Sequence, residues 1–349
     1  MNRDELIARV AEGEVISRVD LTGADLAGAV LAGGIFEEVC FDGANLGGAD
    51  LHESVFTQCR FRGADLTRAS LKNAMINETS FEGASLRNAL LASMQAVGVN
   101  FAGADLTDGD FTIAAMVKND LTGAKLVRAK LDRTAILEAR AERLDLTGAT
   151  LAHAVMVKTD LTTATLTGAV FEVATMVESR FAGQSFRGMN LTLTQFMGAD
   201  MARCDFTGAT VTQCNFKDAD LTEAVFDDAQ AGAMLFVNAK APKATFRRAF
   251  VQQTIFIDAD LRVADFTRAN AQVGMFKKAR CEAARFDNAD LTYADFSNAD
   301  VSAAVFTGAT MFRTILHRVK EQGTVWGNRL VALGDDPDLA AAERWQPST

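Results

Sequence analysis

The sequence predicts an all-β solenoid, a parallel β-helix with four sides per coil and short helical segments at both ends. Three observations predict it. All 60 residues whose numbers end in 1 or 6 are apolar from Leu21 to Leu316, without a slip in the frame. The residue two places before each of these centres is usually alanine or another small residue. The identity of the centres repeats every 20 residues and not every 10.

A period of five residues matches neither the 3.6-residue period of an α-helix nor the two-residue period of a flat strand. It fits a chain that turns a corner every five residues and sends one large and one small side chain inward on each side. The other three residues then face outward or form the turn. The strings ADLTR at 64–68 and ADLTE at 219–223 show this pattern.

The 20-residue repeat gives the coil four sides. Centres from Leu26 to Leu166 in steps of 20 are eight leucines, and those from Phe186 to Phe306 are seven phenylalanines. The interleaved series that starts at Phe36 has a different composition. The patterned residues therefore predict about 15 coils with like side chains stacked along the axis. Such an interior is filled and leaves no room for a ligand.

Residues 1–18 are expected to form an N-terminal helical cap, because an open solenoid edge must be covered. Asn2 has the chemistry of an N-cap, with Glu5 three residues later. Leu6, Ile7 and Val10 share one face of this helix and are suited to cover the first coil. The solenoid proper is assigned to residues 19–316.

Residues 317–349 are assigned to a C-terminal helical or irregular tail. Helical spacing of apolar residues from Phe312 to Val319 predicts one helix that ends at Gly323. Asp336-Pro337 then predicts an N-cap and first turn of another helix that runs to about Trp345. Both tryptophans, Trp326 and Trp345, lie in this tail, either as part of a cap or as partner contacts.

Composition restricts the class of protein. The formal net charge is −10 and no basic patch is visible, which disfavours direct binding to nucleic acid. No run of 18 apolar residues predicts a membrane span, and the first residues lack a signal core, so a cytoplasmic location is expected. The five cysteines have no metal-type spacing, and three of them (Cys59, Cys204 and Cys214) occupy small-residue positions, as expected of buried reduced thiols.

No catalytic, metal-binding or cofactor-binding motif is found in the sequence. The three histidines, His52, His153 and His317, are scattered, and none has a neighbour at metal-ligand spacing. No phosphate loop or nucleophile motif occurs. We therefore expect no enzyme activity and no cofactor.

One side of the coil has apolar residues where outward-facing polar residues are expected. It is the side whose centres run from Phe36 in steps of 20. The candidate contact residues on this side are Val97, Val117, Leu137, Val155, Val157, Val177, Met197, Leu235, Val237, Ile255 and Ile257, to which the tail adds Trp326 and Trp345. Either these residues follow the β-propensity of branched side chains, or they form a contact surface.

The repeats resemble the pentapeptide-repeat family, whose consensus is A(D/N)LXX, over about residues 19–316. The resemblance implies a bacterial protein with a right-handed quadrilateral β-helix and β-turns at its corners. Its family includes fluoroquinolone-resistance proteins that imitate DNA and bind gyrase, proteins that accompany bacterial secretion systems, and members that dimerise through C-terminal helices.

The leading prediction of function is a non-catalytic scaffold or adaptor that binds another protein or a second copy of itself through one face. A secretion-accessory role is implied by the family alone. The alternative is a DNA mimic that binds a type II topoisomerase (gyrase). On one side the residues before the centres mix signs, for example Asp120, Arg140, Asp160 and Arg180, which is unlike the continuous anionic stripe of a duplex.

Overall fold

The computed structural model describes residues 1–345 as stacked parallel coils, which confirms the predicted four-sided β-helix. The residues divide into two compact units where the sequence pattern predicts one solenoid. Unit 1 is Met1–Arg180, and unit 2 begins at Phe181.

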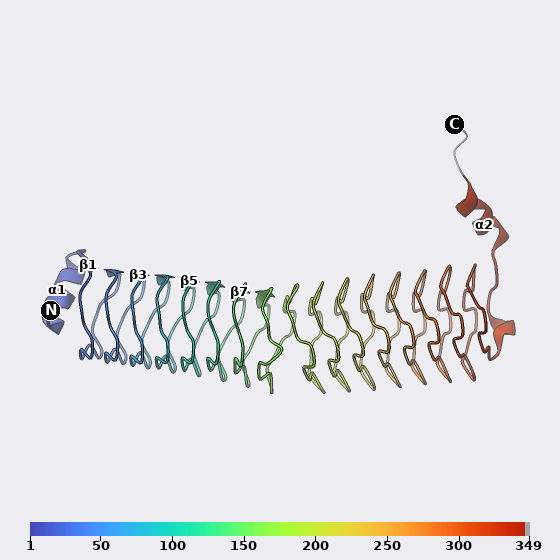
Figure 1. The fold of residues 1–349 in the computed structure, drawn as a ribbon, viewed down its shortest axis with the longest axis horizontal. Coiled ribbons are helices and arrows are strands. Elements are labelled where there is room, and N and C mark those ends of the chain that lie inside the picture. The colour runs from blue at the N-terminus through green and yellow to red at the C-terminus, as the bar shows by residue number, and fades with distance from the viewer. Residues whose placement is uncertain (346–349) are drawn as a thin grey trace. The chain divides into compact units, whose positions relative to one another are not determined.

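Unit 1 begins with the helix α1 (Arg3–Ala11) and continues into one parallel sheet, in which Figure 1 labels alternate strands. The strands occur in chain order and pair with a spacing of 20 residues, as in Val15↔Ile35. They are β1 (Val15–Ser17), β2 (Ile35–Glu37), β3 (Val55–Thr57), β4 (Met75–Asn77), β5 (Gln95–Val97), β6 (Ala115–Val117), β7 (Ala135–Leu137) and β8 (Val155–Val157). In each strand the central residue is buried and its two neighbours face outward.

The regular sheet has eight strands, and therefore seven 20-residue turns, where the repeat predicts about 15 coils. On the other sides, and throughout unit 2, neighbouring coils are joined by single-residue bridges with the same 20-residue spacing. Examples are Asp200↔Asp220 and Asp300↔Lys320. On these sides a tight turn at both corners leaves only one residue in the bridge, so the coils continue without forming further strands.

Helix α1 lies at the N-terminal end of unit 1, where the cap is expected. The Asn2 side chain accepts a hydrogen bond from the Glu5 N–H at 2.9 Å, so it is the N-cap. Leu6 and Val10 are buried, while Ile7 is only half-buried. Burial of these two residues covers the apolar edge of the first coil.

Most corners are type II β-turns. At the corner after Leu21, the Ala24 N–H donates to the Leu21 carbonyl at 3.0 Å, and Gly23 has a φ of +66°. This φ belongs to the third turn residue, where glycine costs least. The residue two places before the next centre is usually small because it points into the coil.

The corner that follows each strand of unit 1 is different, because its backbone turn is open. At the corner after Ala96, the Asn119 side chain of the next coil bridges the two groups that a closed turn would pair. The Asn119 Oδ1 accepts from the Val99 N–H at 2.8 Å, and its Nδ2 donates to the Ala96 carbonyl at 3.3 Å. The Ser179 hydroxyl bridges the Thr159 N–H and the Met156 carbonyl in the same way.

The open corners explain why the small position two residues before the next centre is often not alanine on this side of unit 1. Five of the eight residues at this repeat position of unit 1 have a polar or thiol side chain, Cys59, Thr79, Asn119, Thr159 and Ser179, whereas Val39, Val99 and Ala139 have none. At the same repeat position unit 2 has six consecutive alanines, Ala199, Ala219, Ala239, Ala259, Ala279 and Ala299, before Val319. There the turn closes on itself, as in the hydrogen bond from the Ala199 N–H to the Phe196 carbonyl at 3.1 Å. A closed turn needs no polar side chain.

Two columns of phenylalanine rings fill the core of unit 2. Within a column the rings stack, as for Phe246 and Phe266 with centroids 4.6 Å apart. Between columns they meet edge to face, as for Phe246 and Phe256 at 5.8 Å and 82°. The columns come from opposite sides of the coil, and the other two sides contribute centres that range from alanine, as at Ala241 and Ala271, to leucine, as at Leu261. Small and large sides together give a close-packed interior.

The chain near residues 312–325 forms a further coil where the sequence predicts a helix. The N–H groups of Lys320 and Val325 donate to the carbonyls of Ala299 and Ala304, one coil earlier, at 2.9 and 2.8 Å. The backbone ladder therefore continues past the last apolar centre, Leu316. After the 3₁₀ helix η1 (Arg329–Val331), helix α2 (Pro337–Arg344) begins where the Asp336-Pro337 pair predicts it. The Asp336 side chain caps it.

Candidate functional site

The outward positions of the strand side of unit 1 form an apolar surface, here called the unit 1 patch. Its residues are Val97, Val117, Leu137, Val155, Val157 and Val177. The sheet register aligns Val97 with Val117, Leu137 and Val157 in successive coils. Val177 follows one coil later, since the Lys158 N–H donates to the Val177 carbonyl at 3.1 Å. The structure therefore brings these predicted residues onto one face.

The predicted residues of unit 2 form a second, smaller surface, here called the unit 2 patch. Its residues are Met197, Leu235, Val237, Ile255 and Ile257. Leu235 and Ile255 are bridged in adjacent coils, so four of the five residues lie together. Met197 is separated from Val237 by the coil that carries Lys217. A lysine thus interrupts the apolar series in this unit.

Apolar residues also occupy the corner that precedes these positions, and the sequence pattern did not single them out. Ile113 and Val173 in unit 1, and Leu193 and Val273 in unit 2, have φ values between +57° and +65°. Positive φ is a strained conformation for a β-branched residue. The repeated turn imposes this φ at corners throughout the coil, also on Val263 at another corner, so these four residues are distinguished by an apolar side chain beside the patches. The available sequence signal is an apolar residue at a repeat position where glycine often stands.

Replacing Val273 by glycine is expected to stabilise unit 2. Val273 is 47% exposed and loses little packing, whereas glycine adopts its φ of +57° without strain. The free energy of unfolding should rise by about 1 kcal/mol, measured by urea denaturation. The matched control is Val225→Gly, at a position without positive φ, which should lower stability by about 0.5–1 kcal/mol. An equal loss in both variants would show that the Val273 corner is unstrained.

Charged side chains on the other surfaces are largely paired between neighbouring coils. Arg128 forms a bidentate contact with Asp108 at 2.8 and 2.6 Å, and Arg248 does the same with Asp228 at 2.7 and 2.6 Å. Hydrogen bonds from these guanidinium groups lower the pKa of both carboxyl groups. The carboxylates are therefore ionised at neutral pH, but a cation one coil away offsets each charge.

Comparison with known families identifies the fold at the sequence level. The family model of pentapeptide repeats matches residues 16–53, 49–91, 97–133, 145–181, 174–213, 199–232 and 276–318, more than half of the chain. The chain belongs to the pentapeptide-repeat family. No curated protein matches this pentapeptide-repeat chain.

Several solved structures are similar to this pentapeptide-repeat protein at low identity. HetL from Nostoc sp. PCC 7120, a protein involved in heterocyst differentiation regulation, is 19% identical over 90% of this chain and 96% of its own, with a TM-score of 0.24. Full-length QnrB1, a plasmid-mediated fluoroquinolone resistance protein, is 19% identical over 60% of this chain and 96% of its own, with a TM-score of 0.31. A thylakoid-lumen pentapeptide repeat protein of Arabidopsis thaliana is 26% identical over 39% of this chain and 68% of its own, with a TM-score of 0.13.

Three of the cysteines, Cys59, Cys204 and Cys214, are buried at small-residue positions of the coil. Burial raises the pKa of Cys59 to about 11 and that of Cys204 and Cys214 to about 12, so these thiols stay protonated at neutral pH. Within residues 1–345, no group of three or more His, Cys, Asp or Glu side chains is placed to hold a metal ion. No helix in this described part is long and apolar enough to cross a bilayer.

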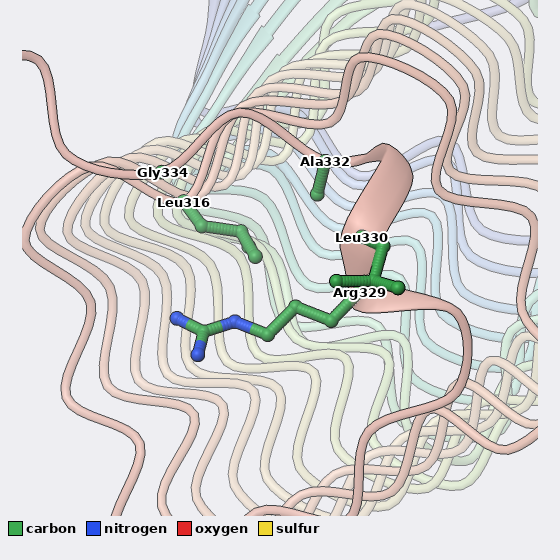
Figure 2. A pocket seen from close by; sticks show the side chains of 5 residues that line it. All are labelled: Leu316, Arg329, Leu330, Ala332 and Gly334. Carbon is green, nitrogen blue, oxygen red and sulfur yellow. The ribbon is translucent and has the colours of Figure 1, made fainter.

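A shallow hollow of about 320 Å³ lies at the C-terminal end of unit 2 (Figure 2). It is lined by Leu316, Arg329, Leu330, Ala332 and Gly334. Leu316 belongs to the buried series of centres, and the hollow is the space above the last coil that η1 only partly covers. The lining supplies one guanidinium group and no carboxylate, imidazole or thiol, so it has no acid–base pair for catalysis.

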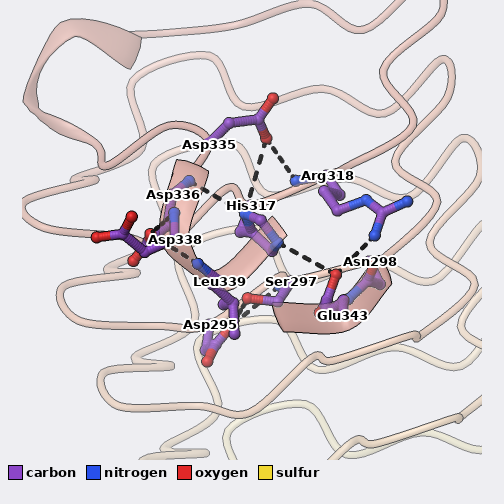
Figure 3. A network of polar contacts seen from close by, with 10 residues as sticks. All are labelled: Asp295, Ser297, Asn298, His317, Arg318, Asp335, Asp336, Asp338, Leu339 and Glu343. Carbon is purple, nitrogen blue, oxygen red and sulfur yellow. Dashed lines mark hydrogen bonds and ion pairs between the residues drawn. The ribbon is translucent and has the colours of Figure 1, made fainter. Parts of the chain in front are cut away.

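His317 links the last coil to helix α2 and is fully buried (Figure 3). Its Nδ1 accepts from the Asp336 N–H at 3.1 Å, which places the proton of the neutral ring on Nε2, 3.4 Å from the Glu343 Oε2. Arg318 donates to the same carboxylate oxygen at 2.7 Å. The tail is therefore anchored to the solenoid by polar contacts.

The two predicted tryptophans lie apart from both patches in sequence and have different surroundings. Trp326 stacks on Phe306 with centroids 4.6 Å apart, and its Nε1–H donates to Glu321 at 3.0 Å. It therefore extends the phenylalanine column at the end of unit 2. Trp345 follows α2 and is 73% exposed. Of the two rings, only that of Trp345 is largely accessible to a partner.

Proposed function

We propose that this pentapeptide-repeat protein is a non-catalytic scaffold that binds a protein partner through the unit 1 and unit 2 patches. The observation that carries the proposal is the run of apolar outward residues in successive coils on one side, whereas other sides carry such residues singly, as at Leu90 and Phe250. β-Propensity accounts for part of this in unit 1, where the regular strands lie on that side, but not for Leu235 and Ile255 of unit 2, which are joined only by a single-residue bridge. An extended apolar surface on a folded protein commonly marks a contact site.

The strained corner residues support the same proposal. Ile113 and Val173 stand beside the unit 1 patch, and Val273 lies on the corresponding corner of unit 2. These side chains are partly or largely exposed, so burial in the core does not offset their strain. Contact with a partner would remove the apolar surface of these side chains from water, which favours binding.

Protein docking explains the surface better than imitation of DNA. A DNA mimic needs a continuous row of uncompensated negative charges. Here Asp108 and Asp228 are neutralised by arginines of neighbouring coils, and Asp160 is likewise contacted by Arg180 at 2.7 Å. We therefore place binding to a type II topoisomerase by charge mimicry second.

Lysine at two positions of the unit 1 patch is expected to abolish partner binding. The tagged full chain is used to capture a partner, which is identified by mass spectrometry, purified and titrated calorimetrically. The double variant Leu137→Lys/Val157→Lys should raise the dissociation constant at least ~10-fold, because two charges would be desolvated in the interface. Leu235→Lys/Ile255→Lys tests the unit 2 patch in the same way.

The matched control is Leu90→Lys. Leu90 is 49% exposed but lies on another side of the coil. This variant should bind with unchanged affinity and keep the circular dichroism spectrum of the wild type. Equal binding by the control and both patch variants would contradict the proposal.

A further inference from the structure

The charges beside the unit 1 patch alternate along the coils. The corner residue after each strand-side position is Lys118, Glu138, Lys158 and Glu178 in four successive coils. All four side chains are more than half exposed. The Lys118 Nζ lies 4.0 Å from the Glu138 Oε2, and the Lys158 Nζ lies 3.6 Å from the Glu178 Oε2. The row is electrically neutral within one chain.

This alternating row is complementary to itself when reversed. A two-fold axis in the plane of the face, parallel to the strands and midway between β7 and β8, exchanges the first coil with the fourth and the second with the third. It places Lys118 opposite Glu178 of a second copy and Glu138 opposite Lys158. Every charge in the row then meets its opposite, which is the requirement of an isologous interface.

The same two-fold axis also places apolar residues opposite apolar residues. The axis places Val117 opposite Val177 and Leu137 opposite Val157, so the centre of the contact is apolar on both sides. On the preceding corner it places Ile113 opposite Val173, the two strained apolar residues of these coils. Arg133 meets His153 and is the one corner position of the four coils without a complementary partner.

We propose that the unit 1 patch binds a second copy of this chain, face to face and antiparallel, about this axis. The proposal rests on the proposed function and names its partner. Four coils at ~4.8 Å spacing extend only about 14 Å between the outer strands. The contact is therefore smaller than the ~800 Å² per partner of a standard interface, and we expect a dissociation constant on the order of 100 μM.

The test is a reversal of all four charges in the full chain, Lys118→Glu, Glu138→Lys, Lys158→Glu and Glu178→Lys. The reversed variant keeps the ion pairs within the chain and should keep its fold, as circular dichroism will show. Sedimentation analysis should find that wild type and reversed variant each self-associate with similar dissociation constants. A mixture of differently labelled wild-type and reversed chains should associate at least ~10-fold more weakly, because like charges then face each other. Leu137→Lys/Val157→Lys should be monomeric at all concentrations.

Two results would overturn antiparallel pairing: a wild-type chain that stays monomeric up to ~1 mM, well above the expected constant, or mixed pairs as tight as the homotypic ones. Neither result contradicts the proposed function if the Leu137→Lys/Val157→Lys variant still binds a captured partner more weakly than the wild type does. Conversely, self-association that survives this double variant, together with unchanged partner binding, would contradict both.

Discussion

Phe246→Ala is expected to cost about 3–5 kcal/mol of unfolding free energy, because it empties a fully buried site in the middle of a ring column. The ring of Phe246 stacks between Phe226 at 5.0 Å and Phe266 at 4.6 Å, and it meets Phe236 and Phe256 edge to face. The deletion therefore removes four aromatic contacts as well as buried area. Urea denaturation of the full chain, followed by circular dichroism, measures the loss.

Phe250→Ala is the matched control for this prediction. Phe250 lies four residues from Phe246 but is an outward residue that is 38% exposed. Its removal should cost less than about 1 kcal/mol, in the range of surface substitutions away from special features. Similar losses in both variants would show that the columns do not carry the stability of unit 2.

The phenylalanine columns were predictable because one sequence position per side must be buried in every coil. The change from leucine to phenylalanine centres between Leu166 and Phe186 is visible in the sequence and precedes the column of unit 2. The C-terminal coil was not predictable in the same way. Glu321 breaks the series of apolar centres there, yet main-chain hydrogen bonds extend the ladder, and Trp326 at the next centre stacks on Phe306.

The candidate surface was predictable only in part. Outward apolar residues such as Leu137 and Val157 follow from the five-residue frame, and the register places them side by side. The strained corner at Ile113 was missed, because the sign of φ is not part of an apolar pattern. The alternating charges that begin at Lys118 are visible in the sequence, but their self-complementarity could not be predicted from it. It depends on which face they share and on a two-fold axis.

The open corners of unit 1 lead to the second large prediction. Asn119→Ala is expected to cost about 2–4 kcal/mol, because it leaves the Val99 N–H and the Ala96 carbonyl without the partners that Asn119 supplies. Asn119 is fully buried, so water cannot readily replace its amide. Urea denaturation of the full chain provides the measurement.

The variant Asn119→Thr distinguishes the effect of losing these hydrogen bonds from the effect of losing side-chain volume. Thr79 occupies the same repeat position two coils earlier, and its Oγ1 accepts from the Cys59 N–H at 3.2 Å. Asn119→Thr should therefore recover most of the stability lost in Asn119→Ala, since one hydroxyl can accept from the Val99 N–H. If alanine is tolerated as well as threonine, the corner must close into the turn seen after Phe196. In that case the bridging side chains are dispensable for unit 1, and the alanines of unit 2 alone are enough to form this corner.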